Sequence, residues 1–220
     1  MTGRSNARLA GWIALVGALS ALSYIGRFTG GKAPHDALYR YSTAASEISL
    51  FAVILALVLT ISRGTTDRRQ LFALRRPRSW RQAAWITLGV LAAVFALESI
   101  LNPLLHAARE QGLTPHGWKP GSAGPFAANV VAFAIVGPVV EELTFRGLGF
   151  SLLQRFGQTA AVLLVGLAFG LWHGLVEALP ILTALGIGLT YLRARTGSVY
   201  PPIVLHAGFN ALALGLAVAS

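Results

Sequence analysis

Ionisable side chains interrupt the apolar stretches in the second half of this 220-residue chain. Glu141 and Glu142 directly follow a hydrophobic run, and Arg146 comes one helical turn later. An ionisable group inside an apolar span costs about 2.5 to 3.5 kcal/mol, so these residues need a structural or a chemical reason. A carboxylate and an imidazole that share one water molecule can remove its proton as it attacks a carbonyl. The chain offers imidazoles for such chemistry at His173 and His206.

The helical period separates the two glutamates. Glu142 and Arg146 are four residues apart, on one helix face and in the order that favours an ion pair. Neighbouring helical positions point about 100° apart, so Glu141 faces elsewhere and has no partner on its own helix. Glu141 is therefore the candidate general base. The alternative interpretation places both carboxylates at the mouth of the helix, in headgroup water.

His173 closes the next apolar run. If the two runs form an antiparallel hairpin that turns near Gly157, Glu141 and His173 each lie sixteen residues, or about 24 Å, from the turn. The two side chains can then meet at one level. Taken alone, His173 would be interpreted as a histidine that only makes hydrogen bonds within a helix bundle.

His206 and Asn210 share one face of the last apolar run because they are four residues apart. Ala207 and Gly208 between them would let another helix approach closely. Imidazole and amide N–H groups can donate hydrogen bonds to a developing oxyanion, where the loss of one donor costs about 10² to 10³ in rate. The alternative for these two residues is an interhelical hydrogen-bond pair without a catalytic role.

The same side chains are compatible with metal-assisted hydrolysis. Glu141, His173 and His206 form a ligand set that suits catalytic zinc with an open water position. The chain lacks the helical His-Glu-x-x-His spacing, and Asn210 is harder to use in a zinc site. We expect no cofactor, and the sequence leaves zinc or another divalent metal open. Because the chain contains no cysteine, disulfides and thiolate ligands are excluded.

The composition predicts that these residues lie in lipid. The chain is 55% hydrophobic and 12% charged, whereas a soluble domain carries about 25% charged residues. Several apolar runs are long enough to cross a hydrocarbon core of ~30 Å. We predict an all-α transmembrane bundle of about seven helices, with the catalytic core in the last four. The predicted spans are 9–28, 44–62, 83–105, 125–155, 158–176, 179–192 and 201–219.

The net charge of +10 comes mostly from arginines in the gaps between these runs. Residues 63–81 hold seven of them, which predicts a cytoplasmic loop and a cytoplasmic N-terminus in a multi-pass protein of the cell membrane. Apolar residues interleave with these arginines, so the segment is either an amphipathic helix on anionic lipid or a solvated loop. Arginines placed in this way do not indicate a nucleic-acid partner.

The chain divides into two predicted units. Residues 1–124 form N-terminal transmembrane helices with the basic loop, and residues 125–219 form the catalytic helical core. Glu47 and Glu98 are the other acids expected within spans. Neither is assigned a catalytic role, and Glu47 is interpreted as a residue near the start of a helix.

The three motifs resemble those of the CPBP family of intramembrane proteases, also called the CAAX-protease and bacteriocin-processing or Abi family. The family signature is Glu-Glu-x-x-x-Arg, Phe-x-x-x-His and His-x-x-x-Asn, each on its own transmembrane helix. In this chain the motifs run from Glu141 to Arg146, from Phe169 to His173 and from His206 to Asn210. The resemblance covers about residues 125–215.

The resemblance implies an intramembrane endopeptidase that cleaves a membrane-associated protein or peptide. It implies that Glu141 and His173 activate a water molecule, and that His206 and Asn210 hold the oxyanion. The supporting residues would be Glu142, Arg146 and Phe169. Family members have been described as metalloproteases and as metal-independent glutamate proteases, and we favour the latter because an oxyanion role explains Asn210. The alternative is a non-enzymatic membrane scaffold or bacteriocin-immunity protein of the same fold.

Overall fold

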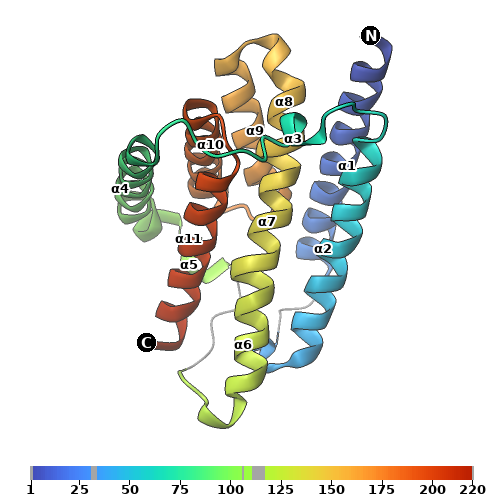
Figure 1. The fold of residues 1–220 in the computed structure, drawn as a ribbon. Helices are drawn as coiled ribbons and strands as arrows, with labels where there is room; N and C mark the ends of the chain where they lie inside the picture. Colours follow the sequence, from blue (N-terminus) through green and yellow to red (C-terminus); the bar gives the residue numbers. More distant parts are fainter. Residues whose placement is uncertain (1, 31–33, 106, 111–116, 220) are drawn as a thin grey trace.

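The computed structural model describes residues 2–30, 34–105, 107–110 and 117–219. Every regular element within these residues is a helix (Figure 1). Five helices are long and apolar enough to cross a membrane: Gly3–Thr29, Tyr41–Ile61, Trp80–Leu105, Pro120–Phe156 and Tyr200–Ala219. The protein is therefore a multi-pass membrane protein built as a helix bundle, as predicted.

The described residues form the following α-helices in chain order. They are α1 (Thr2–Thr29), α2 (Tyr41–Ile61), α3 (Arg68–Leu71), α4 (Trp80–Leu105), α5 (Ala107–Glu110), α6 (Ala123–Val131), α7 (Gly137–Glu142), α8 (Phe150–Leu153), α9 (Gln158–Trp172), α10 (Leu179–Thr196) and α11 (Tyr200–Ala219). The π-helical segments Ala132–Val136 and Leu143–Gly149 join α6, α7 and α8 into one long column (Figure 1).

The fifth predicted span corresponds to a shorter helix, and the sixth to a longer one. α9 has 15 residues and ends at Trp172, not at residue 176 as predicted. It ends there because Gly174 adopts a left-handed conformation with φ of 65°. Fifteen residues extend about 22 Å, less than the ~30 Å hydrocarbon core. α10 extends to Thr196, beyond the predicted end at 192.

The two π-helical segments flank the part of the column that carries both glutamates. Pro138 lies at the start of α7 and lacks the N–H that a regular α-helix needs in its interior. Wider helical turns on either side accommodate the proline without breaking the column, and such turns are frequent at functional sites. Gly137 meets α2, because a Cβ atom there would lie 2.9 Å from Phe51 Cζ.

Glycines bring α9 and α10 into close contact. A Cβ atom on Gly166 would lie 2.7 Å from the backbone nitrogen of Ile187, and one on Gly186 would lie 2.6 Å from the carbonyl oxygen of Gly166. Small residues at such positions are typical of packed transmembrane helices. This contact fixes α10, and with it the backbone around Gly186, against the rest of the bundle.

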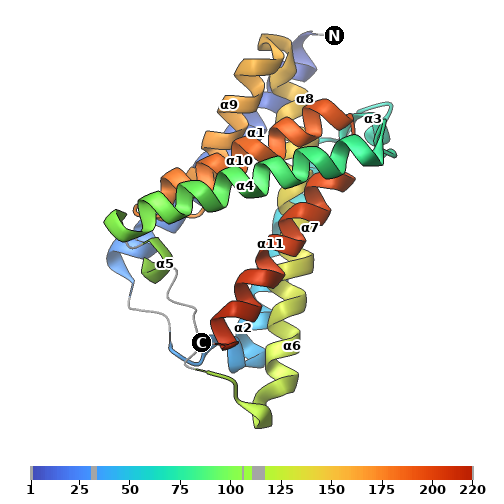
Figure 2. The same ribbon diagram turned by 90° about the vertical axis from the view of Figure 1, so that its left-hand side faces the viewer.

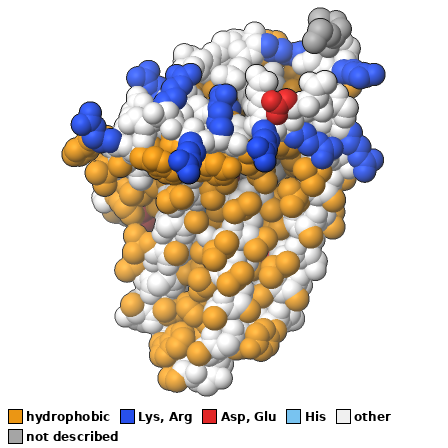
Figure 3. Space-filling model, viewed as in Figure 1, with side chains coloured by type: hydrophobic (Ala, Val, Ile, Leu, Met, Phe, Trp, Pro, Cys, Tyr) orange, Lys and Arg blue, Asp and Glu red, His pale blue; other side chains and the backbone are white. Residues whose placement is uncertain are grey.

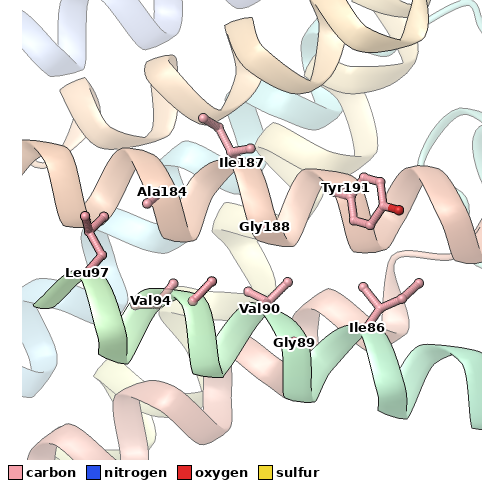
Figure 4. Close-up of a pocket in the computed structure, with 10 residues that line it drawn as sticks. Ile86, Gly89, Val90, Val94, Leu97, Ala184, Ile187, Gly188 and Tyr191 are labelled. Atoms are coloured by element: carbon pink, nitrogen blue, oxygen red, sulfur yellow. The ribbon is translucent and has the colours of Figure 1, made fainter.

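α4 lies on the outer side of α10. Figure 2 shows the two helices side by side, inclined away from the α6–α8 column. Between them runs an apolar groove of about 520 Å³, with Gly89 and Val90 on one wall and Gly188 and Tyr191 on the other (Figure 4). None of the predicted catalytic residues lines this groove.

The structure of the basic segment 63–81 contradicts one of the two predictions made for it. It is not a continuous amphipathic helix, because its only helix before α4 is the single turn of α3. Phe72 packs into the protein core beside Gly147, where its ring is only 3% exposed, and so does not face lipid. The seven arginines are all exposed. Figure 3 shows basic side chains, which are arginines, gathered at the end of the molecule that holds the N-terminus.

One hydrophobic cluster joins the two predicted units. Trp12 and Phe51 from the N-terminal helices pack in it with Phe145 and Phe169 from the later ones. Trp12 also donates a hydrogen bond of 2.9 Å from Nε1 to the carbonyl of Thr144. The N-terminal helices therefore stabilise the column that carries the motifs. The boundary near residue 124 stays a prediction.

The α9–α10 contact can be tested with a substitution at Gly166. Gly166→Leu is expected to lower the thermal stability of the detergent-solubilised protein, because the new side chain meets the backbone of α10 and overpacking costs about 1 to 3 kcal/mol. Gly17→Leu on α1 is the matched control, since a Cβ there has nothing within 4 Å. Equal melting temperatures for the two variants would contradict the close contact.

Candidate active site

The predicted ion pair between Glu142 and Arg146 is present and fully buried. Arg146 Nη1 lies 2.8 Å from Glu142 Oε1, and neither side chain has any exposed surface. Arg146 also donates from Nη2 to the carbonyl of Gly186 at 2.8 Å and from Nε to Thr190 Oγ1 at 3.2 Å. The pair therefore joins the α6–α8 column to α10. A position in headgroup water, the alternative from the sequence, is wrong for Glu142.

His206 is a second partner of the Glu142 carboxylate. Its Nδ1 lies 2.9 Å from Glu142 Oε1, so this oxygen faces both Arg146 and His206. A carboxylate oxygen accepts, so Nδ1 carries the proton and Nε2 of neutral His206 is free of one. This contact was not predicted, because it joins Glu142 of α7 to His206 of α11, which are 64 positions apart.

The predicted meeting of Glu141 and His173 is also present. Glu141 Oε2 lies 3.9 Å from His173 Nε2 and 3.8 Å from His206 Nε2. Both distances exceed the usual hydrogen-bond range of about 2.7 to 3.2 Å. Glu141 is 8% exposed, and its Oε2 has no hydrogen-bond partner among the described residues. One carboxylate oxygen thus lies between two imidazole nitrogens.

The backbone carbonyl of Phe169 sets the tautomer of His173. It lies 2.8 Å from His173 Nδ1 and can only accept, so Nδ1 carries the proton and Nε2 of neutral His173 is an acceptor. The Phe169 ring packs edge-on against His173 and His206, with centroids 4.8 and 5.4 Å apart. The guanidinium carbon of Arg146 lies 4.3 Å from the centre of the same ring. Phe169 therefore separates the ion pair from His173 and holds both in place.

Asn210 lies one helical turn beyond His206 on α11. Its Nδ2 donates a hydrogen bond of 2.9 Å to the carbonyl of Phe133, in the first π-helical segment. The same nitrogen carries a second N–H. This bond fixes the orientation of the carboxamide relative to the α6–α8 column.

A cavity of about 490 Å³ connects these side chains. Its lining includes Glu141, His173, His206 and Asn210. Most of the remaining lining is apolar and comes from α1, α2, α9, α10 and α11. The structure therefore brings together all four residues predicted to be catalytic. Glu47 of α2 also lines the cavity, although no role there was predicted for it.

The same side chains are the candidate ligands of a metal ion. Within the described parts of the chain, no group of three or more His, Asp or Glu side chains is arranged to hold one. Zinc requires its nitrogen and oxygen ligands at about 2.0 to 2.2 Å. The 3.8 and 3.9 Å that separate Glu141 Oε2 from the two Nε2 atoms are donor–donor distances, not metal–ligand distances. Metal independence stays a prediction, and the reaction proposed below uses only side chains and water.

The family comparison covers the segment that carries the three motifs. Residues 123–212 match the model of a family described as "Type II CAAX prenyl endopeptidase Rce1-like". The resemblance to the CPBP family is confirmed. A relative from Bacillus subtilis (strain 168), named "Putative membrane peptidase YdiL", is 33% identical over 82 residues, which are 37% of this chain and 34% of the relative. The chain thus spans about a third of the length of that relative. No solved structure matches the chain.

The buried ion pair makes a prediction about stability. Arg146→Met should lower the stability of the purified protein by about 3 to 5 kcal/mol, because it leaves Glu142 as a buried charge without its main partner. Thermal unfolding in detergent measures the loss. The double variant Arg146→Met/Glu142→Leu removes both charges and should recover part of the stability. A single variant as stable as the wild type would contradict the structural role of the pair.

Proposed function

We propose that the protein is an intramembrane endopeptidase that hydrolyses a peptide bond of a membrane-associated protein or peptide. The observation that carries the proposal is the position of Glu141 Oε2, buried in a membrane-level cavity at 3.8 and 3.9 Å from two imidazole Nε2 atoms. Polar contacts of this length suit a bridging water. A water molecule there would touch a carboxylate and an imidazole at once.

Glu141 is the general base of the proposed reaction. His173 Nε2 accepts one hydrogen bond from the water and orients it, while Glu141 takes the other proton. The resulting hydroxide oxygen forms a bond to the carbonyl carbon of the substrate. Glu141 then returns the proton to the leaving amine as the C–N bond breaks. General-base assistance of this kind contributes about 10² to 10⁴ in rate.

Asn210 and His206 are the proposed donors to the oxyanion. Asn210 offers its second Nδ2 N–H, since the first is bound to Phe133. His206 donates from Nε2 only as an imidazolium, because its Nδ1 proton already points at Glu142. Glu142 accepts the hydrogen bond from Nδ1 of that ring, and Arg146 holds the Glu142 carboxylate in place. Glu142 and Arg146 are thus positioning residues in this mechanism.

The distribution of basic side chains supports one orientation of the protein in the cell membrane. Positive residues concentrate on the cytoplasmic side of membrane proteins. We therefore assign the cytoplasmic side to the basic end in Figure 3, which also holds the N-terminus. The exposed arginines of residues 63–81 then face the anionic lipid of the inner leaflet.

Replacement of Glu141 tests the proposed function. Glu141→Gln and His173→Ala are each expected to reduce cleavage by at least about 10², because each removes one partner of the water. The substrate is found by comparing membrane-protein termini between a deletion strain and strains that express the wild type or a variant. Glu98→Gln on α4, outside the cavity, is the control and should cleave normally. Full complementation of the deletion by Glu141→Gln would favour the non-enzymatic scaffold.

Chelation tests the choice of a metal-independent mechanism. The purified protein should keep its Glu141-dependent cleavage after prolonged treatment with a divalent-metal chelator, because the proposed steps use only side chains and water. Elemental analysis of the same preparation should find less than one zinc per chain. Loss of cleavage with chelator and recovery with zinc would replace this mechanism by a metal-assisted one.

A further inference from the structure

Glu47 has no assigned role, and it lies in the same cavity as the proposed catalytic residues. It belongs to α2 and is half-buried at the level of the apolar walls. Its carboxylate makes no hydrogen bond or ion pair with any residue that the structure describes. Glu142, by contrast, is bound by Arg146 and His206. An unpaired carboxylate at membrane depth is costly, and such residues usually serve a substrate or an ion.

The helix packing sets the distance between Glu47 and the reacting centre. α2 and the α6–α8 column run in the same direction (Figure 1), and they touch where Phe51 meets Gly137. Glu47 lies one helical turn before Phe51, and Glu141 lies one turn after Gly137. The two glutamates are therefore about eight residues apart along the helix axis, or roughly 12 Å.

A peptide in the cavity would span this distance in a few residues. An extended chain rises about 3.3 Å per residue, so 12 Å corresponds to three or four residues of a bound peptide. Two residues are enough when a long side chain of the peptide covers part of the distance. The cavity offers apolar walls to most of such a segment. The carboxylate of Glu47 places an unpaired negative charge in the cavity. A positive charge on the substrate would be complementary to it.

We infer that Glu47 binds a lysine or arginine side chain of the substrate, two to four residues from the scissile bond. The inference rests on the proposed function and adds the substrate class. An ion pair formed there compensates the buried charge of Glu47 and sets the register of the peptide on Glu141. Glu47 is in this sense a specificity-determining residue, and it takes no part in the bond-breaking steps.

Two variants of Glu47 distinguish charge recognition from a structural role. Glu47→Gln keeps the shape and removes the charge, and Glu47→Lys reverses it. The purified proteins are incubated in liposomes with a randomised library of apolar peptides that carry a Lys, Gln or Glu at each position. Mass spectrometry of the products then gives the residue preference at each position relative to the cut.

The wild type should prefer Lys over Gln by about tenfold at one position two to four residues from the cut. Glu47→Gln should lose this preference, and Glu47→Lys should prefer Glu there. Glu98→Gln is the matched control and should behave as the wild type. The melting temperature of each variant shows that it is folded.

The outcomes separate this inference from the proposed function. If the wild type gives no products that depend on Glu141, the proposed function fails. If the products depend on Glu141 and their composition is the same for all Glu47 variants, the function stands and the role of Glu47 is refuted. That second result would mean that Glu47 is hydrated in the cavity and binds no side chain of the substrate.

Discussion

The ion pair between Glu142 and Arg146 holds the candidate site together. It is fully buried in a protein whose surroundings are lipid, so neither charge can be satisfied by water. Arg146 extends from the column to α10 through Gly186 and Thr190, and Glu142 extends to α11 through His206. One pair thereby fixes three separate helices. The relative positions of Glu141, His173 and His206 follow from that arrangement.

Close helix packing and the ion pair meet at one residue. Gly186 accepts the hydrogen bond from Arg146, and a Cβ atom on it would lie 2.6 Å from the carbonyl oxygen of Gly166 on α9. The π-helical segments on both sides of α7 keep the column continuous past Pro138 and still turn Glu141 into the cavity. Local helix geometry and tertiary packing are therefore coupled at the motif itself.

The sequence predicted the parts of the site that depend on local geometry. The Glu142–Arg146 pair follows from a spacing of four residues, and the common level of Glu141 and His173 follows from the length of one hairpin. The His206–Glu142 bond could not be predicted, because it depends on where α11 packs. The same limit applies to Phe72, since an apolar residue among arginines suits a lipid surface and a protein core equally well.

The partners of Glu142 show that the two glutamates of the first motif are not equivalent. Two adjacent glutamates resemble a pair of equivalent acids, but one faces a cavity and the other faces a guanidinium and an imidazole. Because Glu142 holds the Nδ1 proton of His206, Nε2 of that histidine can donate only when the ring is positively charged. That positive charge would balance Glu141, whose own helix supplies no cation to it. In the proposed mechanism, the second glutamate therefore acts through His206, and the first is the base.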